Sequence, residues 1–317
     1  MIVTVTPNPS VDWTLEIPEL IRGAVHRISG DHQEPSGKGV NVSRALTANA
    51  VPTLAVVPVG GTEGVELETL LRGEGVPFVA VPIMGRVRVN ISLTEPDGHA
   101  TKINAPGPTL LDEEVNALLA SAASAGSGAN WVLGSGSLPR GVPSDFYAQL
   151  GAAVAVTGAR FAVDSSGAAL VVGLAARPDV IKPNAPELAE AVGRSLVTVG
   201  DAVQAAEELR NRGARTVVVS LGRDGALLVD DDGALHAEAV VLDPKSTVGA
   251  GDAMLAGYLA GRERHDQDRA AALREAVAWG SGAVATVGSH VPAITDAHRR
   301  AVEITQDVEA GRLLSGT

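Results

Sequence analysis

The segment Ser246–Leu259, with the sequence STVGAGDAMLAGYL, places a glycine-rich turn directly before an apolar helix. The free backbone N–H groups and the positive end of such a helix can hold an anion. Gly249 and Gly251 allow the backbone to approach a ligand closely. Asp252 is unexpected there, because a carboxylate repels a bound phosphate. It is either a helix cap or a general base that accepts a proton from an attacking hydroxyl beside a transferring phosphoryl group.

Short β-rich runs alternate with Ala-rich helical stretches along most of the remaining chain. The strands are predicted at 2–6, 54–59, 131–133, 160–164, 180–182, 216–220 and 226–229. Helical periodicity marks 41–50, 65–72, 112–123, 144–156 and 201–212. This alternation predicts an α/β fold with a mostly parallel sheet covered by helices on both faces. The C-terminal third, from Gly251 onward, is expected to be mainly helical.

Two regions, at about 13–32 and 86–103, do not follow the alternation of strands and helices. In each of them, apolar and polar residues alternate with no helix between them. Such alternation is typical of antiparallel ribbons. We expect the two regions to form one small β-sheet appendage that serves as a lid. The lid would be inserted into a single domain that spans residues 1–317.

The composition excludes several classes of protein. The 317 residues carry a formal net charge of −12, which argues against a broad phosphate-binding footprint on DNA or RNA. The absence of cysteine excludes disulfides, thiolate nucleophiles and Cys-zinc sites. No apolar run approaches the ~18 residues of a membrane span, and the segment Met1–Thr6 lacks the basic residues of a signal peptide. A cytoplasmic enzyme is therefore expected.

The chain has only four lysines, Lys38, Lys102, Lys182 and Lys245, among 25 basic residues. Arginine-favouring codon usage explains this bias if the lysines are incidental. The alternative is that some of these positions need a compact ammonium group rather than a planar guanidinium. Each lysine lies beside Gly, Asn, Pro or Ser rather than on a clear helix face, which favours the second interpretation.

The common nucleotide-binding motifs are absent. A Walker A loop needs Gly-x4-Gly-Lys-Ser/Thr, but Gly37-Lys38 is followed by Gly39. The catalytic loop of protein kinases is also missing. A dinucleotide fingerprint should follow the first strand, where the chain instead has Pro7-Asn8-Pro9-Ser10. Any nucleotide site must therefore use another scheme.

Eight segments, in order, resemble the ribokinase-type carbohydrate kinases, and specifically the phosphofructokinase-B branch that includes 1-phosphofructokinases and tagatose-6-phosphate kinases. They are TPNPSVD (6–12), SGKGVNVSRAL (36–46), RVN (88–90), NAPGP (104–108), GSLPRG (136–141), KPNAPEL (182–188), SLGRDGA (220–226) and GAGD (249–252). The resemblance extends to about Gly288 and implies a ribokinase-like three-layer α/β/α sandwich. The sequence departs from the family pattern at Ser36, where a glycine is usual.

On the nucleotide side, the resemblance implies that ATP and Mg²⁺ are cofactors. Asp252 would be the catalytic base, and the N–H groups around Gly249, Ala250 and Gly251 would stabilise charge on the γ-phosphate. Asn184 and Glu187 would hold Mg²⁺ through water. The cofactor-binding residues would be Lys182, Asn184, Ser220, Gly222, Gly225, Ser281 and Gly282, the last two at the adenine. Taken singly, Asn184 and Glu187 also fit a polar loop that starts a helix. The set Ser220, Gly222 and Gly225 also fits a plain β-turn, and Ser281 and Gly282 also fit ordinary helix packing.

On the sugar side, Asp12, expected at the end of the first strand, would bind substrate hydroxyls. Gly37, Gly39 and Asn41, before a helix, would bring the backbone close to the sugar. The ammonium of Lys38 would meet the substrate's phosphate. Arg88, Lys102 and Arg140 are further candidates for that phosphate, although each alone fits a solvated surface charge.

The resemblance implies transfer of the γ-phosphate of ATP to a phosphorylated ketohexose, with fructose 1-phosphate as the preferred acceptor and fructose 1,6-bisphosphate as the product. Tagatose 6-phosphate and fructose 6-phosphate are the alternative acceptors. A non-catalytic sugar-phosphate sensor would need neither Asp252 nor the Asn184–Glu187 pair, and the proline-rich first turn disfavours a Rossmann oxidoreductase. No nucleic-acid or membrane partner is expected, and exposed edges of the lid would favour a homodimer.

Overall fold

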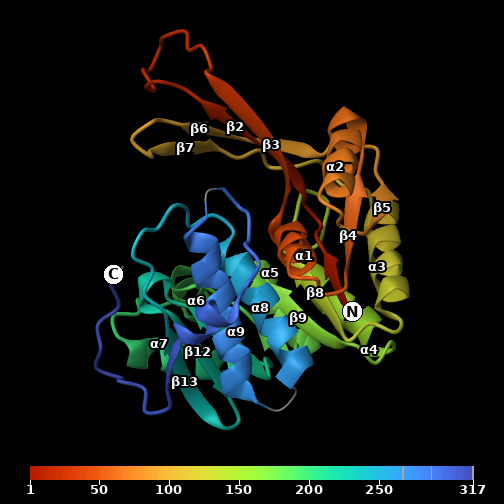
Figure 1. Ribbon diagram of the computed structural model, residues 1–317. Helices are drawn as coiled ribbons and strands as arrows, with labels where there is room; N and C mark the ends of the chain where they lie inside the picture. Colours follow the sequence, from red (N-terminus) through yellow and green to blue (C-terminus); the bar gives the residue numbers. More distant parts are fainter. Residues whose placement is uncertain (266–267, 287, 316–317) are drawn as a thin grey trace.

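The computed structural model describes residues 1–265, 268–286 and 288–315. Within these residues, a ten-stranded sheet has the order β14-β13-β12-β11-β10-β9-β8-β1-β4-β5 (Figure 1). Its parallel strands are β1 (Ile2–Val5), β4 (Thr53–Val59), β5 (Phe78–Pro82), β8 (Trp131–Ser135), β9 (Arg160–Asp164), β10 (Val180–Ile181) and β11 (Thr216–Ser220). The antiparallel edge consists of β12 (Ala226–Asp230), β13 (Gly233–Glu238) and β14 (Glu303–Thr305). The prediction of a mostly parallel sheet is confirmed.

The central strands are buried on both faces. In β1, all four residues are buried, and neighbouring side chains enter different apolar clusters: Val3 and Val5 enter one, and Ile2 enters the other. A strand covered on both faces reads as a continuous apolar run, as the sequence IVTV nearly does. The sheet therefore separates two hydrophobic cores.

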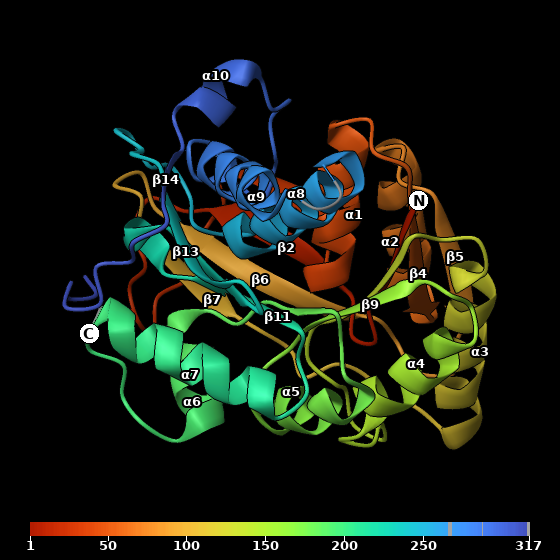
Figure 2. The same cartoon turned by 90° about the horizontal axis from the view of Figure 1, so that it is seen from below.

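Helices cover both faces, as Figure 2 shows. One face is covered by α3 (Asp112–Gly126), α4 (Phe146–Ala155), α5 (Gly167–Gly173), α6 (Ala185–Val192) and α7 (Val199–Asn211). The other is covered by α1 (Lys38–Ala48), α8 (Ala250–His265) and α9 (Arg269–Val284), with the short α10 (Asp296–Arg300) against α9. The remaining helices are α2 (Gly61–Gly73) and the one-turn 3₁₀ helices η1 (Leu174–Ala176) and η2 (Gly222–Asp224). This arrangement confirms the three-layer sandwich and the helical C-terminal third.

A second, four-stranded sheet stands away from the three layers, in the order β3-β2-β6-β7 (Figure 1). It consists of β2 (Ser10–Glu16), β3 (Gly30–Ser36), β6 (Arg88–Thr94) and β7 (Ala100–Ile103). The pairs β2–β3 and β6–β7 are antiparallel, as predicted for the two ribbons, whereas β2 and β6 join them in parallel. The two irregular regions of the sequence therefore form one sheet.

The position expected for Asp12 is wrong. The first strand ends at Val5, and Asp12 lies in β2 of the small sheet, opposite Asn90. The prolines at positions 7 and 9 separate the two strands, because proline lacks an N–H and cannot donate to a strand ladder.

Among the described residues, no helix combines the length and the hydropathy required to cross a bilayer.

Close packing between α8 and α9 fixes the helical layer that carries the glycine-rich turn. A Cβ placed on Gly257 of α8 would lie 2.6 Å from Cγ of Trp279 and 2.7 Å from the carbonyl oxygen of Glu275. Trp279 is fully buried, and its Nε1 donates a hydrogen bond to Glu275 Oε2 at 3.0 Å. Neither neighbour is free to move away.

We predict that Gly257→Ala lowers the free energy of unfolding by about 1–3 kcal/mol, because the added methyl group overpacks this contact. Gly73→Ala is the matched control, since Gly73 ends α2 and a Cβ placed there would have no neighbour within 4 Å. Urea unfolding should show the control as stable as the parent or slightly more stable. Equal effects of the two substitutions would contradict the prediction.

Candidate active site

The candidate site lies at the edge where the parallel strands of the large sheet end. The carboxyl ends of parallel strands meet at one edge, which is where open α/β sheets bind ligands. Asp164 ends β9, Lys182 follows β10, and Ser220 ends β11. The N-termini of α1 and α8 reach the same edge, because Lys38 of α1 contacts Asp164 and Asn41 of α1 contacts Asp252 of α8.

Asp252, in the first turn of α8, is buried, and its Oδ2 accepts a hydrogen bond from Asn41 Nδ2 of α1 at 2.8 Å. Burial and the nearby carboxylate of Asp164 raise the pKa of Asp252 to about 6. The ammonium groups of Lys38 and Lys182 and the Asn41 hydrogen bond oppose that rise. A carboxylate with a pKa close to neutral is suited to accept and return a proton.

Lys38 is held by two carboxylates from distant parts of the chain. Its Nζ lies 3.0 Å from Asp164 Oδ1 and 3.1 Å from Glu187 Oε1. Burial lowers the pKa of Lys38, but Asp164, Glu187 and Asp252 together raise it above its usual value. Lys38 is therefore a permanent cation at the centre of the site.

Lys182 brings a second ammonium group to the glycine-rich turn. It is buried, with Nζ 3.6 Å from Asp164 Oδ1, and a Cβ placed on Gly251 would lie 3.3 Å from this nitrogen. Gly249 has a φ of 74°, in the left-handed region that favours glycine, and α8 begins at Ala250. The predicted anion site therefore combines a helix N-terminus with a buried cation.

The start of α1 needs two glycines: Gly37 precedes the helix, whereas Gly39 and Asn41, which were expected before it, lie in its first turn because the helix begins at Lys38. Gly37 has a φ of 116°, and a Cβ placed on Gly39 would collide with Thr6 Oγ1. Ser36, by contrast, lies within β3 and pairs with Ser10. The departure from the family's glycine therefore falls on a strand residue, whose extended backbone any residue can adopt.

Asn184 and Glu187 form a capping box at the start of α6. Asn184 Oδ1 accepts from the Glu187 N–H at 2.8 Å, and Glu187 Oε2 accepts from the Asn184 N–H at 2.9 Å. Glu187 Oε1 faces Lys38. The box holds the Glu187 carboxylate against the same lysine that contacts Asp164.

The turn predicted to wrap the nucleotide follows β11 as expected. Ser220 ends the strand and bridges to Asn184, while Gly222 begins η2 and Gly225 follows it, with φ values of 64° and 80°. A Cβ placed on Gly225 would collide with the carbonyl oxygen of Ala237, so only glycine fits there. This turn therefore lies beside the Asn184–Glu187 capping box.

The two residues assigned to the adenine lie within α9. Ser281 Oγ donates to the carbonyl of Ala278 at 3.2 Å, and a Cβ on Gly282 would lie 2.9 Å from Ile294 Cδ1. These contacts favour a helix-packing role for Gly282, and its place at the adenine stays a prediction.

On the sugar side, the small sheet carries a polar network. Asp12 Oδ1 accepts from Ser10 Oγ at 2.7 Å and from Asn90 Nδ2 at 2.8 Å. Arg88 donates to the carbonyl oxygens of Asn8 and Ala105, both at 3.0 Å. The Arg88 guanidinium is thus fixed at the start of β6, where the small sheet meets the loop after β1.

The structure does not bring Lys102 and Arg140 into this cluster. Both are exposed, Lys102 on the edge strand β7 and Arg140 in the loop after β8. Within the described residues, neither side chain makes a hydrogen bond or an ion pair. Their assignment to the substrate phosphate stays a prediction.

Asp164 is the principal residue that the sequence analysis missed. It is fully buried, pairs with both lysines, and its Oδ2 lacks a partner in the described part of the chain. The available signal was a carboxylate that ends a buried strand. Further buried oxygens that are unpartnered among the described residues lie at or just after the carboxyl ends of β1 and β8, namely Thr6 Oγ1, Asn8 Oδ1 and Ser135 Oγ. Such groups mark a place for polar ligand atoms or water.

The chain is similar to known carbohydrate kinases in sequence and in fold. Residues 9–296 match the pfkB family carbohydrate kinases. The chain is 38% identical over 261 residues to a 1-phosphofructokinase of Bacillus subtilis, covering 82% of this chain and 85% of that protein. It is 39% identical over 297 residues to a 1-phosphofructokinase of Haloferax volcanii, covering 93% and 95%. The crystal structure of Escherichia coli phosphofructokinase-2 in complex with fructose-6-phosphate aligns with a TM-score of 0.86 and 33% identity, over 95% of this chain and 97% of that chain.

We predict that Asn41→Ala raises the pKa of Asp252 above 6, because it removes a hydrogen bond to the charged carboxylate. The carboxyl ¹³C chemical shift of Asp252, followed through a pH titration, measures this change. Asn90→Ala is the matched control, since it removes an amide from Asp12 instead. An unshifted titration of Asp252 in Asn41→Ala would contradict the prediction.

Proposed function

The chain belongs to the pfkB family of carbohydrate kinases and has the ribokinase-like fold, and we propose that its acceptor is a phosphorylated ketohexose. The kinase uses ATP, as its family does. The proposed acceptor is fructose 1-phosphate and the proposed product is fructose 1,6-bisphosphate. The chemistry is transfer of the γ-phosphate to a substrate hydroxyl, whose proton must go to a base.

The observation that carries the proposal is the buried Asp252 carboxylate at the N-terminus of α8. Its Oδ2 is oriented by Asn41, and its pKa of about 6 leaves it charged at neutral pH. In this role, Asp252 accepts the proton of the attacking hydroxyl. The N–H groups at Gly249, Ala250 and Gly251, with the Lys182 ammonium beside them, stabilise the charge that builds on the transferred phosphoryl group.

The residues at the site also fit Mg²⁺, which prefers oxygen ligands and keeps several waters. The Asp164 Oδ2 is buried without a partner among the described residues, and the Glu187 carboxylate contacts the same Lys38 ammonium as Asp164. Asn184 and Glu187 would hold the ion through water, with Asp164 as a third oxygen donor. When bound, Mg²⁺ neutralises phosphate charge on ATP.

Lys38 supports a phosphorylated acceptor. An ammonium group has three N–H donors, and two of them point to Asp164 and Glu187. The third is available to a phosphate oxygen, and the side chain is one-third exposed. Arg88, held at the start of β6, is a second candidate for that phosphate.

The choice of fructose 1-phosphate rests on two curated relatives named 1-phosphofructokinase. Fructose 6-phosphate is the alternative, because the E. coli phosphofructokinase-2 structure holds that sugar. Tagatose 6-phosphate remains a third acceptor to test. A coupled assay of ADP release with the three sugar phosphates side by side decides among them. If no ADP is released with any of the three, the result would favour a sugar-phosphate sensor.

Residues 1–317 are proposed to act as one kinase domain in which the small sheet is the lid. The tip of its β2–β3 ribbon exposes Ile21, Val25 and Ile28, and its outer strands β3 and β7 have free edges within the described part of the chain. These features support a homodimer through the lid. A cytoplasmic location fits the absence of cysteine and substrates of this kind.

We predict that Asp252→Asn lowers kcat by about 10²–10⁴-fold, because the amide cannot accept the hydroxyl proton. The amide oxygen can still accept the Asn41 hydrogen bond, so the site keeps its shape. Calorimetry should therefore show nearly unchanged ATP binding. A kcat within a fewfold of the parent enzyme would contradict the role of Asp252 as base.

We predict that Glu187→Gln raises the Mg²⁺ concentration needed for half-maximal rate, because the substitution removes a charge near the ion. Gln can still complete the capping box, so α6 should form as before. Glu190→Gln is the matched control, since it removes an exposed carboxylate one turn later on the same helix. If both variants follow the parent's Mg²⁺ curve, Glu187 has only a capping role.

We predict that Lys38→Ala raises the KM for the sugar phosphate about ten- to a hundredfold, with a much smaller effect on the KM for ATP. A charge-assisted hydrogen bond to phosphate is worth roughly 1.5–3 kcal/mol. Unphosphorylated fructose should lose little, because it never makes this contact. A full matrix of both enzymes against ATP and each acceptor measures the effect, and a loss confined to ATP would place Lys38 at the nucleotide phosphates instead.

A further inference from the structure

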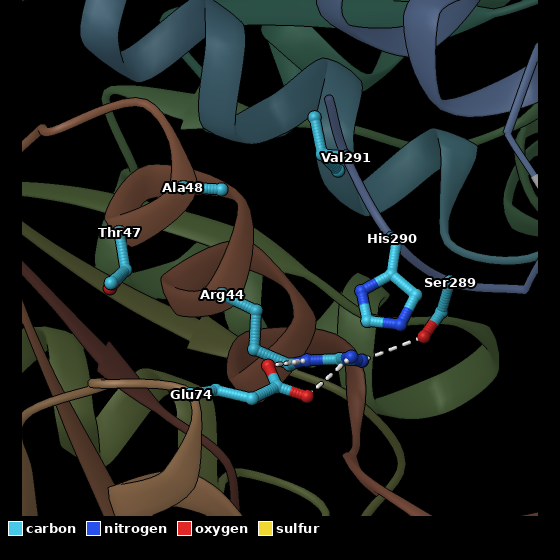
Figure 3. Close-up of a pocket in the computed structure, with 7 residues that line it drawn as sticks. All are labelled: Arg44, Thr47, Ala48, Glu74, Ser289, His290 and Val291. Atoms are coloured by element: carbon cyan, nitrogen blue, oxygen red, sulfur yellow. Dashed lines mark hydrogen bonds and ion pairs between the residues drawn. The ribbon is translucent and has the colours of Figure 1, made fainter. Parts of the chain in front are cut away.

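Two histidines and a glutamate from distant parts of the sequence meet beside the small sheet. His32 and Glu34 lie on β3, and His290 lies in the loop after α9. One ligand atom from each of the three residues lies within 4.8 Å of the other two. Figure 3 shows His290 next to Ser289 and Arg44, at a cavity of about 310 Å³ that also contacts Glu74.

The distances in this group are close to those of a metal site. Tetrahedral ligands at about 2.1 Å from an ion lie about 3.4 Å from one another. His290 Nε2 is 3.1 Å from Glu34 Oε1, and His32 Nε2 is 3.9 Å from the same oxygen. The His32 side chain is 64% exposed, so a rotation of this side chain can close the remaining gap.

Glu34 can turn one oxygen to an ion without leaving a buried cation unpaired. Arg44 donates to Glu34 Oε1 at 3.1 Å, but it also binds Glu74 through two hydrogen bonds, at 2.5 and 2.8 Å, and Ser289 Oγ at 2.7 Å. The contacts of Arg44 with Glu74 and Ser289 are the dashed lines of Figure 3. Arg44 therefore keeps its charge partner when an ion takes Glu34 Oε1.

We propose that His32, Glu34 and His290 bind one divalent transition-metal ion of the Zn²⁺ class. Two imidazole nitrogens and one carboxylate oxygen, with water in the fourth position, form a donor set that suits Zn²⁺, Co²⁺ or Ni²⁺. Mg²⁺ is a poor competitor, because it prefers oxygen ligands and octahedral geometry. The site is separate from the oxygen donors Asp164 and Glu187 proposed for Mg²⁺.

A bound ion would tie the small sheet to the body of the enzyme. His32 and Glu34 belong to β3, whereas His290 follows Ser289, whose Cβ lies 3.5 Å from a Cβ placed on Gly249. The ion would therefore join the strand that leads into Lys38 to the loop that packs against the glycine-rich turn. Binding to the folded state alone raises its melting temperature.

Titration of the metal-depleted full-length enzyme with Co²⁺, in the presence of excess Mg²⁺, tests the proposal. The visible absorption of tetrahedral Co²⁺ should grow to one ion per chain, and Zn²⁺ should displace it. His32→Ala and His290→Ala should each weaken Co²⁺ binding at least about 100-fold, since even loss of a group outside the ligand set costs about 10–100-fold. Both variants should lose most of the rise in melting temperature that Zn²⁺ produces.

His99→Ala is the matched control. His99 is exposed on the β6–β7 turn, where its Nδ1 pairs with Asp97 at 2.7 Å. The substitution therefore removes a histidine–carboxylate pair from the same sheet. Binding in this variant should equal binding in the parent. If the metal-free melting temperature of either alanine variant falls, the corresponding glutamine variant, His32→Gln or His290→Gln, is tested in its place.

The proposal is overturned if the parent shows no tetrahedral Co²⁺ spectrum, or if the His32 and His290 variants bind as the parent does. It is also overturned if His99→Ala weakens binding as much as they do. Each result is independent of phosphoryl transfer, so it leaves the proposed function to its own tests.

Discussion

The charge balance around Asp164 holds the site together. Three carboxylates, Asp164, Glu187 and Asp252, lie at the carboxyl edge of the large sheet; Asp164 and Asp252 are buried, and burial raises the pKa of Asp252. Lys38 contacts Asp164 and Glu187 directly, and the Lys182 ammonium lies 3.6 Å from the same Asp164 oxygen that Lys38 contacts. Removal of Lys38 would leave Glu187 without an ion-pair partner among the described residues and Asp164 with only the longer Lys182 contact. The cluster therefore fixes where α1, β9 and α6 meet.

The same cluster explains how one carboxylate can act as a base. Burial and Asp164 raise the pKa of Asp252, and the lysines and Asn41 limit that rise, so the proton affinity of Asp252 is a balance between burial and its neighbours. Asn41 comes from α1 and Asp252 from α8, so this balance depends on how the two helices pack. The contact of Gly257 with Trp279 fixes α8 against α9 and thereby supports that packing.

Most of the fold could be predicted from the sequence. The strands at 160–164 and 216–220 were predicted at their observed bounds, because a continuous apolar run bounded by turn residues is a local signal. The antiparallel edge of β13 and β14 was missed, since β14 has three residues and pairs with a strand 65 positions earlier at Glu238–Glu303. Helices α5 and α6 were missed because each has fewer than three turns. Short elements depend on tertiary packing rather than on their own periodicity.

The sequence by itself determined the family, the sandwich of helices and sheet, and the residue types that gather at the strand ends, because the glycine turns and the segments 36–46, 182–188 and 249–252 are local patterns. The sequence also indicated that some lysine positions need a compact ammonium group rather than a guanidinium. Two of these lysines, Lys38 and Lys182, do lie at the site. Only the tertiary structure decided that Lys38 pairs with Asp164 and Glu187, and that Asp164 belongs to the site at all. Those contacts join residues 126 and 149 positions apart. The electrostatic energy of a buried charge depends on such neighbours, which no local pattern specifies.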